Sequence, residues 1–135
     1  MASDVLAKYA SAPAVAAAEY SLGSYEFLTG EMLDLYDGLA KRILNIDASV
    51  RIEFKKLYIA FKATTNFVDI VPQKSKLTLS LNIPFDEIVD PLGLCKDVSA
   101  IGHWGNGDAE IGVNSADDVD YAMDLILQAF EWQVG

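Results

Sequence analysis

The segment 97–110 holds the densest group of residue types that could do chemistry in this chain. Glycines at positions 102, 105 and 107 permit positive φ angles and close approach of the backbone to another group. His103 is the chain's single histidine, and imidazole changes its charge near neutral pH. We therefore predict a small binding pocket in this loop, and its candidate contact residues are Asp97, His103, Trp104, Asn106 and Asp108.

Two other interpretations of this loop stay open. In the first it is a structural turn, with Trp104 closing the edge of the core and His103 bonded to a backbone carbonyl. In the second the chain is a hydrolase or a nucleic-acid-processing accessory domain, and His103 acts with Asp97 or Asp108 as an acid–base pair. A carboxylate within hydrogen-bond reach of an exposed His103 would favour catalysis, whereas a packed imidazole would favour structure.

Other candidate chemistry has weaker support. Ser99 or Cys95 could pair with His103, but no nucleophile motif surrounds either residue. The run 117–120 lacks the spaced oxygens and the glycine of a calcium loop. The segment 53–55, Glu-Phe-Lys, is similar to the acid-x-lysine pattern of metal-dependent nucleases, with Asp47 or Asp37 as the first acid. We expect no catalytic residue, no metal site and no cofactor.

Composition narrows the class of protein. The chain has 135 residues, 52% of them apolar, which fits one domain with a substantial core. Residues 82–135 carry eleven acidic residues and one base, Lys96, so the whole net charge of −10 lies there. Such a field repels phosphate backbones, and we expect no direct binding to duplex nucleic acid. Tyr58, Phe61, Phe67 and Phe85 could suggest a stacking platform for single strands, but aromatic residues at strand spacing are more often core. A weak nucleic-acid surface stays conceivable beside the five lysines of the segment 55–76.

The sequence also bears on location. No apolar stretch approaches the ~20 residues that span a bilayer. The apolar stretch 12–18 follows no basic run and ends at Glu19, which is unlike a secretory signal. With one free cysteine, these features predict a cytoplasmic protein with no membrane partner.

Periodicity predicts an α+β fold. An alanine-rich, partly ordered lead-in, 1–20, precedes a single domain, 21–135. Thr29 caps a helix that runs to Asn45, and Ser115 with Asp118 caps a final helix whose core stripe is Val119, Met123, Ile126 and Phe130. Strands are expected at 57–62, 66–71, 77–83 and 109–113, and the third alternates so that Thr78 and Ser80 meet solvent.

Two segments are harder to assign. Residues 50–56 fit either a strand or a short helical turn, and 84–108 is expected to be irregular, with one helical turn at 86–89. The expected order is α-β-β-β-β-α. It gives a two-layer domain with a mainly antiparallel sheet of about four strands and two amphipathic helices on one face.

Several stretches together resemble a family of known sequences. They are 57–62, 66–72, 76–79, Asp90-Pro91-Leu92-Gly93, and above all the Gly-His-Trp-Gly-x-Gly-Asp stretch 102–108. The chain resembles, over about residues 20–132, a bacterial and archaeal domain family of unknown function labelled "predicted transport protein". The resemblance implies a domain that often stands C-terminal to nuclease-like domains, and it supplies no catalytic residues. The partner is expected to be an unknown protein or a small ligand.

Overall fold

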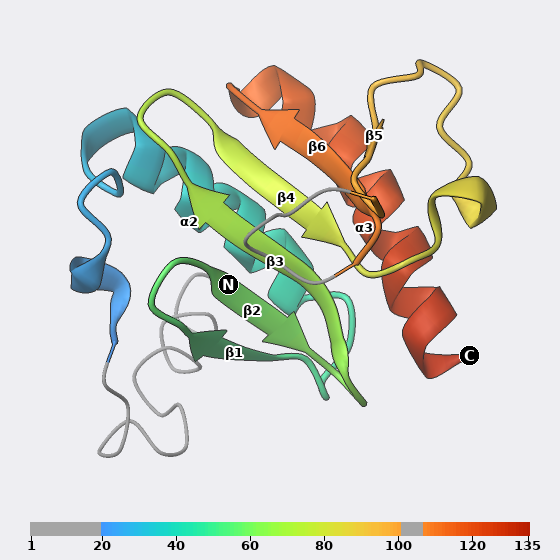
Figure 1. Cartoon of the computed structure of the whole chain (residues 1–135). Helices are drawn as coiled ribbons and strands as arrows, with labels where there is room; N and C mark the ends of the chain where they lie inside the picture. The colour runs from blue at the N-terminus through green and yellow to red at the C-terminus, as the bar shows by residue number, and fades with distance from the viewer. Residues whose placement is uncertain (1–19, 101–106) are drawn as a thin grey trace.

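The computed structural model describes residues 20–100 and 107–135 (Figure 1). All of the predicted lead-in except Tyr20 lies outside these ranges, so the predicted domain boundary stays a prediction. One long helix precedes the strands and the other follows them, which is an α+β arrangement. The elements are η2 (Leu22–Ser24), α2 (Gly30–Leu44), β1 (Arg51–Phe54), β2 (Ile59–Lys62), β3 (Asn66–Pro72), β4 (Leu77–Leu81), η3 (Phe85–Glu87), β5 (Lys96–Asp97), β6 (Ala109–Val113), η4 (Ala116–Asp118) and α3 (Val119–Val134).

The strands form one antiparallel sheet in the order β1-β2-β3-β4-β6-β5. Six strands replace the four that we expected. β1 settles the ambiguous segment 50–56 as a strand, since all four of its residues pair with β2. β5 lies within the segment expected to be irregular. Two residues are too few to leave an alternating pattern, so only its pairing with β6 identifies it as a strand.

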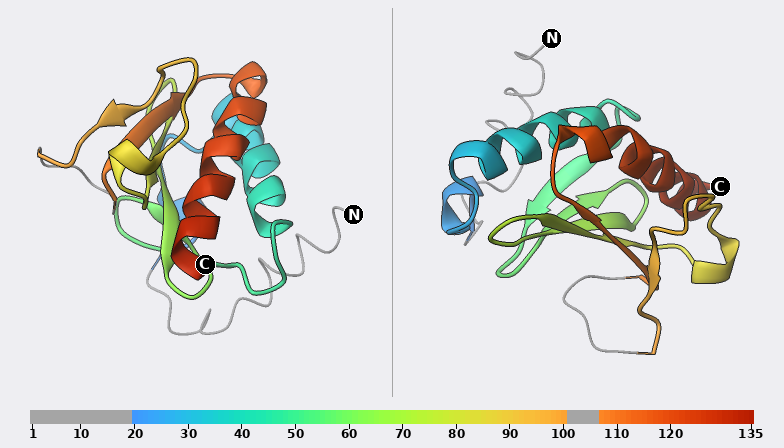
Figure 2. Two further views of the ribbon diagram at one scale, coloured as in Figure 1. Left: turned by 90° about the vertical axis from the view of Figure 1, so that its right-hand side faces the viewer. Right: turned by 90° about the horizontal axis from the view of Figure 1, so that it is seen from above.

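Both long helices pack on the same face of the sheet, as the two turned views in Figure 2 show. α2 buries Tyr36, Leu39 and Ile43, whose spacing places them on one face of the helix. Thr29 occupies the predicted N-cap position, but its side chain makes no capping hydrogen bond. No helix in the described part of the chain is long and apolar enough to cross a membrane.

The buried face of α3 differs from the predicted stripe. Val119 and Ile126 are buried, but Met123 and Phe130 only partly so. Alanines on α3 take part of the core positions expected for Met123 and Phe130, because their small side chains let the helix backbone approach the sheet closely. The buried residues are Val119, Ala122, Leu125, Ile126 and Ala129. Ser115 and Asp118 do form the predicted capping box, at the start of η4, the short 3-10 turn that leads into α3.

A bulge in β3 adds to the core. Phe61 pairs with Val68 and Lys62 with Asn66, so Phe67 is an extra residue on β3. A bulge turns adjacent side chains toward the same side, and both Phe67 and Val68 belong to the core. The ring of Phe67 meets that of Phe130 edge-on, with centroids 5.2 Å apart. The bulge thus fastens β3 to α3.

Candidate functional site

One residue from every strand forms a transverse row on the face of the sheet opposite the helices, toward the viewer in Figure 1. Among the described residues, no helix packs on this face, which we call the helix-free face. Successive side chains of a strand point to opposite faces, so directly paired residues share a face. The register gives a polar row of Glu53, Ala60, Asp69, Ser80, Glu110 and Lys96.

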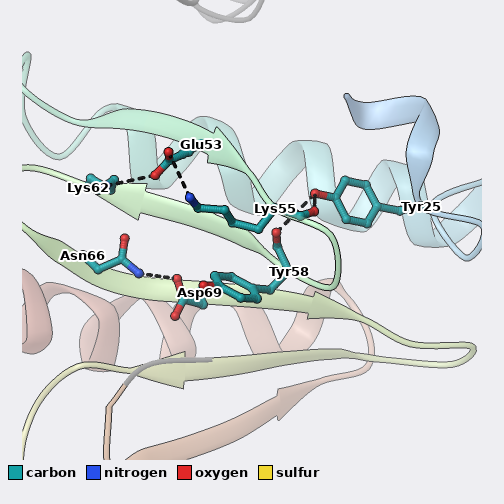
Figure 3. Close-up of polar contacts among 7 residues, drawn as sticks. All are labelled: Tyr25, Glu53, Lys55, Tyr58, Lys62, Asn66 and Asp69. Atoms are coloured by element: carbon teal, nitrogen blue, oxygen red, sulfur yellow. Dashed lines mark hydrogen bonds and ion pairs between the residues drawn. The ribbon is translucent and has the colours of Figure 1, made fainter. Parts of the chain in front are cut away.

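The middle of the polar row is buried. Asp69 is 1% exposed and Ser80 is 2% exposed. The predicted alternation in β4 is therefore only half right, since Thr78 and Ser80 do not meet solvent. Asn66 donates its side-chain amide to the Asp69 carboxylate at 2.6 Å (Figure 3). Buried polar groups persist where hydrogen bonds satisfy them, so the row is built into the fold rather than left as a solvated surface.

At the β1 end of the row, Glu53 binds two lysines. Its carboxylate lies 2.9 Å from Lys62 Nζ and 3.1 Å from Lys55 Nζ (Figure 3). The hydrogen bonds from Lys62 and Lys55 outweigh desolvation and lower the pKa of Glu53. The buried Tyr25 hydroxyl donates to the backbone oxygen of Lys55, and burial raises the pKa of Tyr25 to about 12. Tyr25 thereby fixes the hairpin that carries these charges.

This geometry does not assemble the nuclease-like pattern. Glu53 and Lys55 meet in an ion pair. Asp47 instead accepts hydrogen bonds from the backbone and hydroxyl of Ser49, and Asp37 lies on α2, in the helix layer. In the ranges that the structure covers, no three His, Cys, Asp or Glu side chains gather closely enough to hold a metal ion.

The aromatic residues considered for a stacking platform belong mainly to the core, as is more often the case for aromatic residues at strand spacing. Phe61 and Phe67 are fully buried in the core, and Phe85 packs against it. Two lysines of this region reach the helix-free face: Lys62 stands two residues after Ala60 of the row on β2, and Lys76, just before β4, lies two residues before Thr78. The stem of Lys76 lies over Gly112, where an added Cβ would be 3.4 Å from its Cδ.

The loop 97–110 is anchored at both ends. Lys96 pairs with Glu110 and Asp97 with Ala109, and the Val98 amide donates to the Asp108 carbonyl at 2.9 Å. Gly107 has a φ of +101°, and a Cβ there would lie 2.2 Å from the Leu81 carbonyl oxygen. The expectation of positive φ and close backbone approach is therefore confirmed at Gly107.

The predicted contact residues divide into two groups. Asp97 is exposed, and it accepts hydrogen bonds from the Ser99 hydroxyl at 2.7 Å and the Ser99 amide at 3.0 Å. These bonds lower the pKa of Asp97. Asp108 is half-buried beside the start of β6. The remaining predicted contacts, His103, Trp104 and Asn106, lie outside the described residues, so pairing of His103 with either carboxylate stays a prediction.

The sequence reasoning missed Asp69, Ser80 and Asn66. One signal could have found them: Asp69 interrupts the apolar run 67–71, where an acid must be buried or force the strand to an edge. Cys95, considered as a nucleophile, is half-buried. Burial, aided by the nearby Asp90 charge, raises the pKa of the Cys95 thiol to about 12, which disfavours a thiolate.

Comparison with known sequences places the chain in a family. A family model described as a domain of unknown function, DUF5655, matches residues 25–133. An uncharacterized protein of Haemophilus influenzae is 45% identical over 98 residues, which is 73% of this chain and 32% of that relative. The chain thus spans about a third of that relative's length. No solved structure matches. The transport label and nuclease-like neighbours implied by the resemblance stay predictions. The chain belongs to the DUF5655 family of domains of unknown function.

Proposed function

We propose that the chain is a non-catalytic binding module that contacts a partner protein or a small ligand. Its contact surface is the loop 97–110 together with the adjoining helix-free face. The observation that carries this proposal is the polar row, which crosses all six strands and ends in the stem of that loop at Glu110 and Lys96. A cytoplasmic location is the setting we expect for it.

The energetics of the row favour a binding role. A buried Asp69 costs free energy unless hydrogen bonds hold it, and an apolar residue would fill the same place without that cost. Asp69 and Ser80 are buried, so their part is to stiffen the sheet that carries the exposed end of the row at Lys96. Sites built on strands hold their groups more rigidly than sites built on loops alone.

The charges around the row indicate the sign of the ligand. Lys55, Lys62, Lys76 and Lys96 lie on or beside the helix-free face, although the whole chain has a net charge of −10. Glu53, Asp69 and Glu110 in the row offset much of this charge, Glu53 through its two ion pairs. An anionic group of a ligand would therefore bind at the flanking lysines rather than at the acids of the row.

The proposal is tested by recording assigned backbone NMR spectra during titration with three probes at millimolar concentration. The probes are inorganic pyrophosphate, a glutamate-rich peptide and a short single-stranded oligothymidylate. We expect at least one of them to shift amides next to Asp69, Ser80 and Glu110 and to leave α2 unchanged. Lys62→Ala should weaken this binding, and Lys41→Ala, the same charge change on α2, should not.

Shifts confined to the helices, or equal effects of the two lysine variants, would contradict the proposal. The catalytic alternative has its own readout. Sustained hydrolysis of a phosphodiester or ester probe, lost on His103→Ala with the fold intact, would replace the binding module with an enzyme.

A further inference from the structure

Residues 82–95, which we call the excursion, lie lengthwise along α3 (Figures 1 and 2). The Gln128 side chain accepts from the Val89 amide at 2.7 Å and donates to the Val89 carbonyl at 2.9 Å. Two helical turns earlier, the Tyr121 hydroxyl accepts from the Leu92 amide at 3.0 Å. Seven residues, about two helical turns, separate Tyr121 from Gln128, so both tethers lie on the same side of α3.

Asp90 locks the turn between these tethers. Its carboxylate accepts hydrogen bonds from the Tyr121 hydroxyl, the Cys95 amide at 2.7 Å and the Leu94 amide at 3.2 Å. Gly93 supplies the left-handed conformation of the turn, with a φ of +64°. The excursion is therefore held in one shape by side chains of α3 and by its own carboxylate.

This fixed segment presents large apolar side chains to solvent. Val89 is 67% exposed, Leu92 is 65% exposed and Leu94 is 55% exposed. On α3, Trp132 is 49% exposed and lies one turn beyond Gln128, the residue that tethers Val89. Exposed apolar groups that gather on an ordered surface, with a tryptophan among them, are typical of protein contact sites.

The surroundings of these side chains are acidic. Asp86 and Glu87 are exposed on η3, and Asp124 and Glu131 are exposed on α3. The sequence has no lysine or arginine in the excursion or in α3. Any occupant of this surface must therefore bring apolar anchors and positive charge together.

We propose that the excursion and the adjoining side of α3 dock an amphipathic segment of a partner protein, with aliphatic or aromatic anchors set between lysine and arginine residues. This surface is separate from the helix-free face, and the inference does not rest on the proposed function. Two copies of the chain that met through this same surface would bring acid against acid, and anionic lipid headgroups would meet the same repulsion. A basic partner segment meets no such repulsion.

The test uses a designed peptide of leucine and lysine at helical spacing, with binding followed by fluorescence anisotropy. We expect a complex that weakens as salt rises. Leu92→Ser should weaken binding about tenfold, the loss usual for one anchor of an interface. The matched control is Leu57→Ser, which removes a leucine 44% exposed in the turn between β1 and β2 and should leave binding unchanged. Both sites are exposed, so neither variant threatens folding.

Three outcomes would overturn the proposal. The first is equal affinity of the wild type and Leu92→Ser, and the second is equal loss in the two leucine variants. The third comes from sedimentation: self-association of the wild type that Leu92→Ser abolishes would identify the occupant as a second copy. A peptide of leucine and glutamate serves as the charge control and should not bind.

Discussion

The helix-free face and the excursion differ in how they are built and in what they carry. The first is made by backbone pairing across six strands and buries polar groups, among them Asp69 and Ser80. The second is made by side-chain tethers to backbone and exposes apolar groups, among them Val89 and Leu92. On the first, lysines flank the acids of the polar row, whereas the second carries acids and no base. The net charge of −10 is therefore unevenly spread, and only the second surface calls for a basic partner.

Gly107, in the loop 97–110, and Gly93, in the excursion, both have a positive φ, and substituting each one tests how differently the two regions are anchored. Gly107→Ala places a Cβ 2.2 Å from the Leu81 carbonyl oxygen at a φ of +101°. Backbone strain and overpacking together should destabilise the protein by about 3 kcal/mol or more. Denaturant unfolding measures the loss.

Gly93→Ala is the matched control. Its φ is +64°, and nothing lies within 4 Å of the added Cβ, so only the left-handed conformation is strained. A loss of about 1–2 kcal/mol is expected. Equal losses in the two variants would mean that the loop 97–110 is no more firmly anchored than the excursion.

The second test compares two acids. Asp69→Ala removes a buried carboxylate and leaves the Asn66 amide without its partner, so unfolding free energy should fall by about 2 kcal/mol. Asp124→Ala, on the exposed side of α3, should change it by less than about 0.5 kcal/mol. A small effect at Asp69 would show that the polar row is not an integral part of the sheet.

The elements were more predictable than the site. Four strands and both helices follow from periodicity, because one buried face leaves a regular trace in the sequence. The bulge at Phe67 was not predictable, since a single inserted residue looks like part of an apolar run. β5 is defined by a partner twelve or more residues away. The polar row depends on the register of all six strands, which no local pattern encodes.

The ordered shape of the excursion was not predictable from the sequence either, because it too depends on long-range contacts. Its glycine and proline residues predicted irregular backbone, and only one short turn of helix forms there, at η3. Its order comes from Tyr121 and Gln128, which lie outside the buried stripe of α3. Hydrogen bonds from side chains to backbone groups far away in the sequence leave no periodic pattern that could predict them.

A third test uses pH to release the excursion. Desolvation opposes ionisation of Asp90, but hydrogen bonds from Tyr121 and from the Cys95 and Leu94 amides outweigh it and lower the pKa of Asp90. A lowered folded-state pKa means that the stabilisation is present above the ordinary pKa of an aspartate and is lost as pH falls through the folded value. Methyl NMR signals of Leu92 and Leu94 should therefore shift toward random-coil positions below about pH 4. Asp90→Asn should give the same random-coil shifts already at neutral pH. Leucine signals that neither low pH nor Asp90→Asn changes would refute this role of Asp90.

The smallest expected effect is chemical rather than thermodynamic, and it reports local opening of the excursion. The Cys95 thiol, with its pKa raised to about 12, is ionised in on the order of one molecule in ten thousand at pH 8. Because the thiolate is the form that alkylating reagents attack, iodoacetamide should modify Cys95 at least about a hundredfold more slowly than it modifies a free cysteine. Tyr121→Phe removes one tether and lets the excursion open more often, so its alkylation should be faster with global stability nearly unchanged. Lys62→Ala, on the helix-free face, should leave the rate as it is. An equal acceleration by both variants would mean that Cys95 is exposed by unfolding of the whole domain, and the two surfaces would then not open independently.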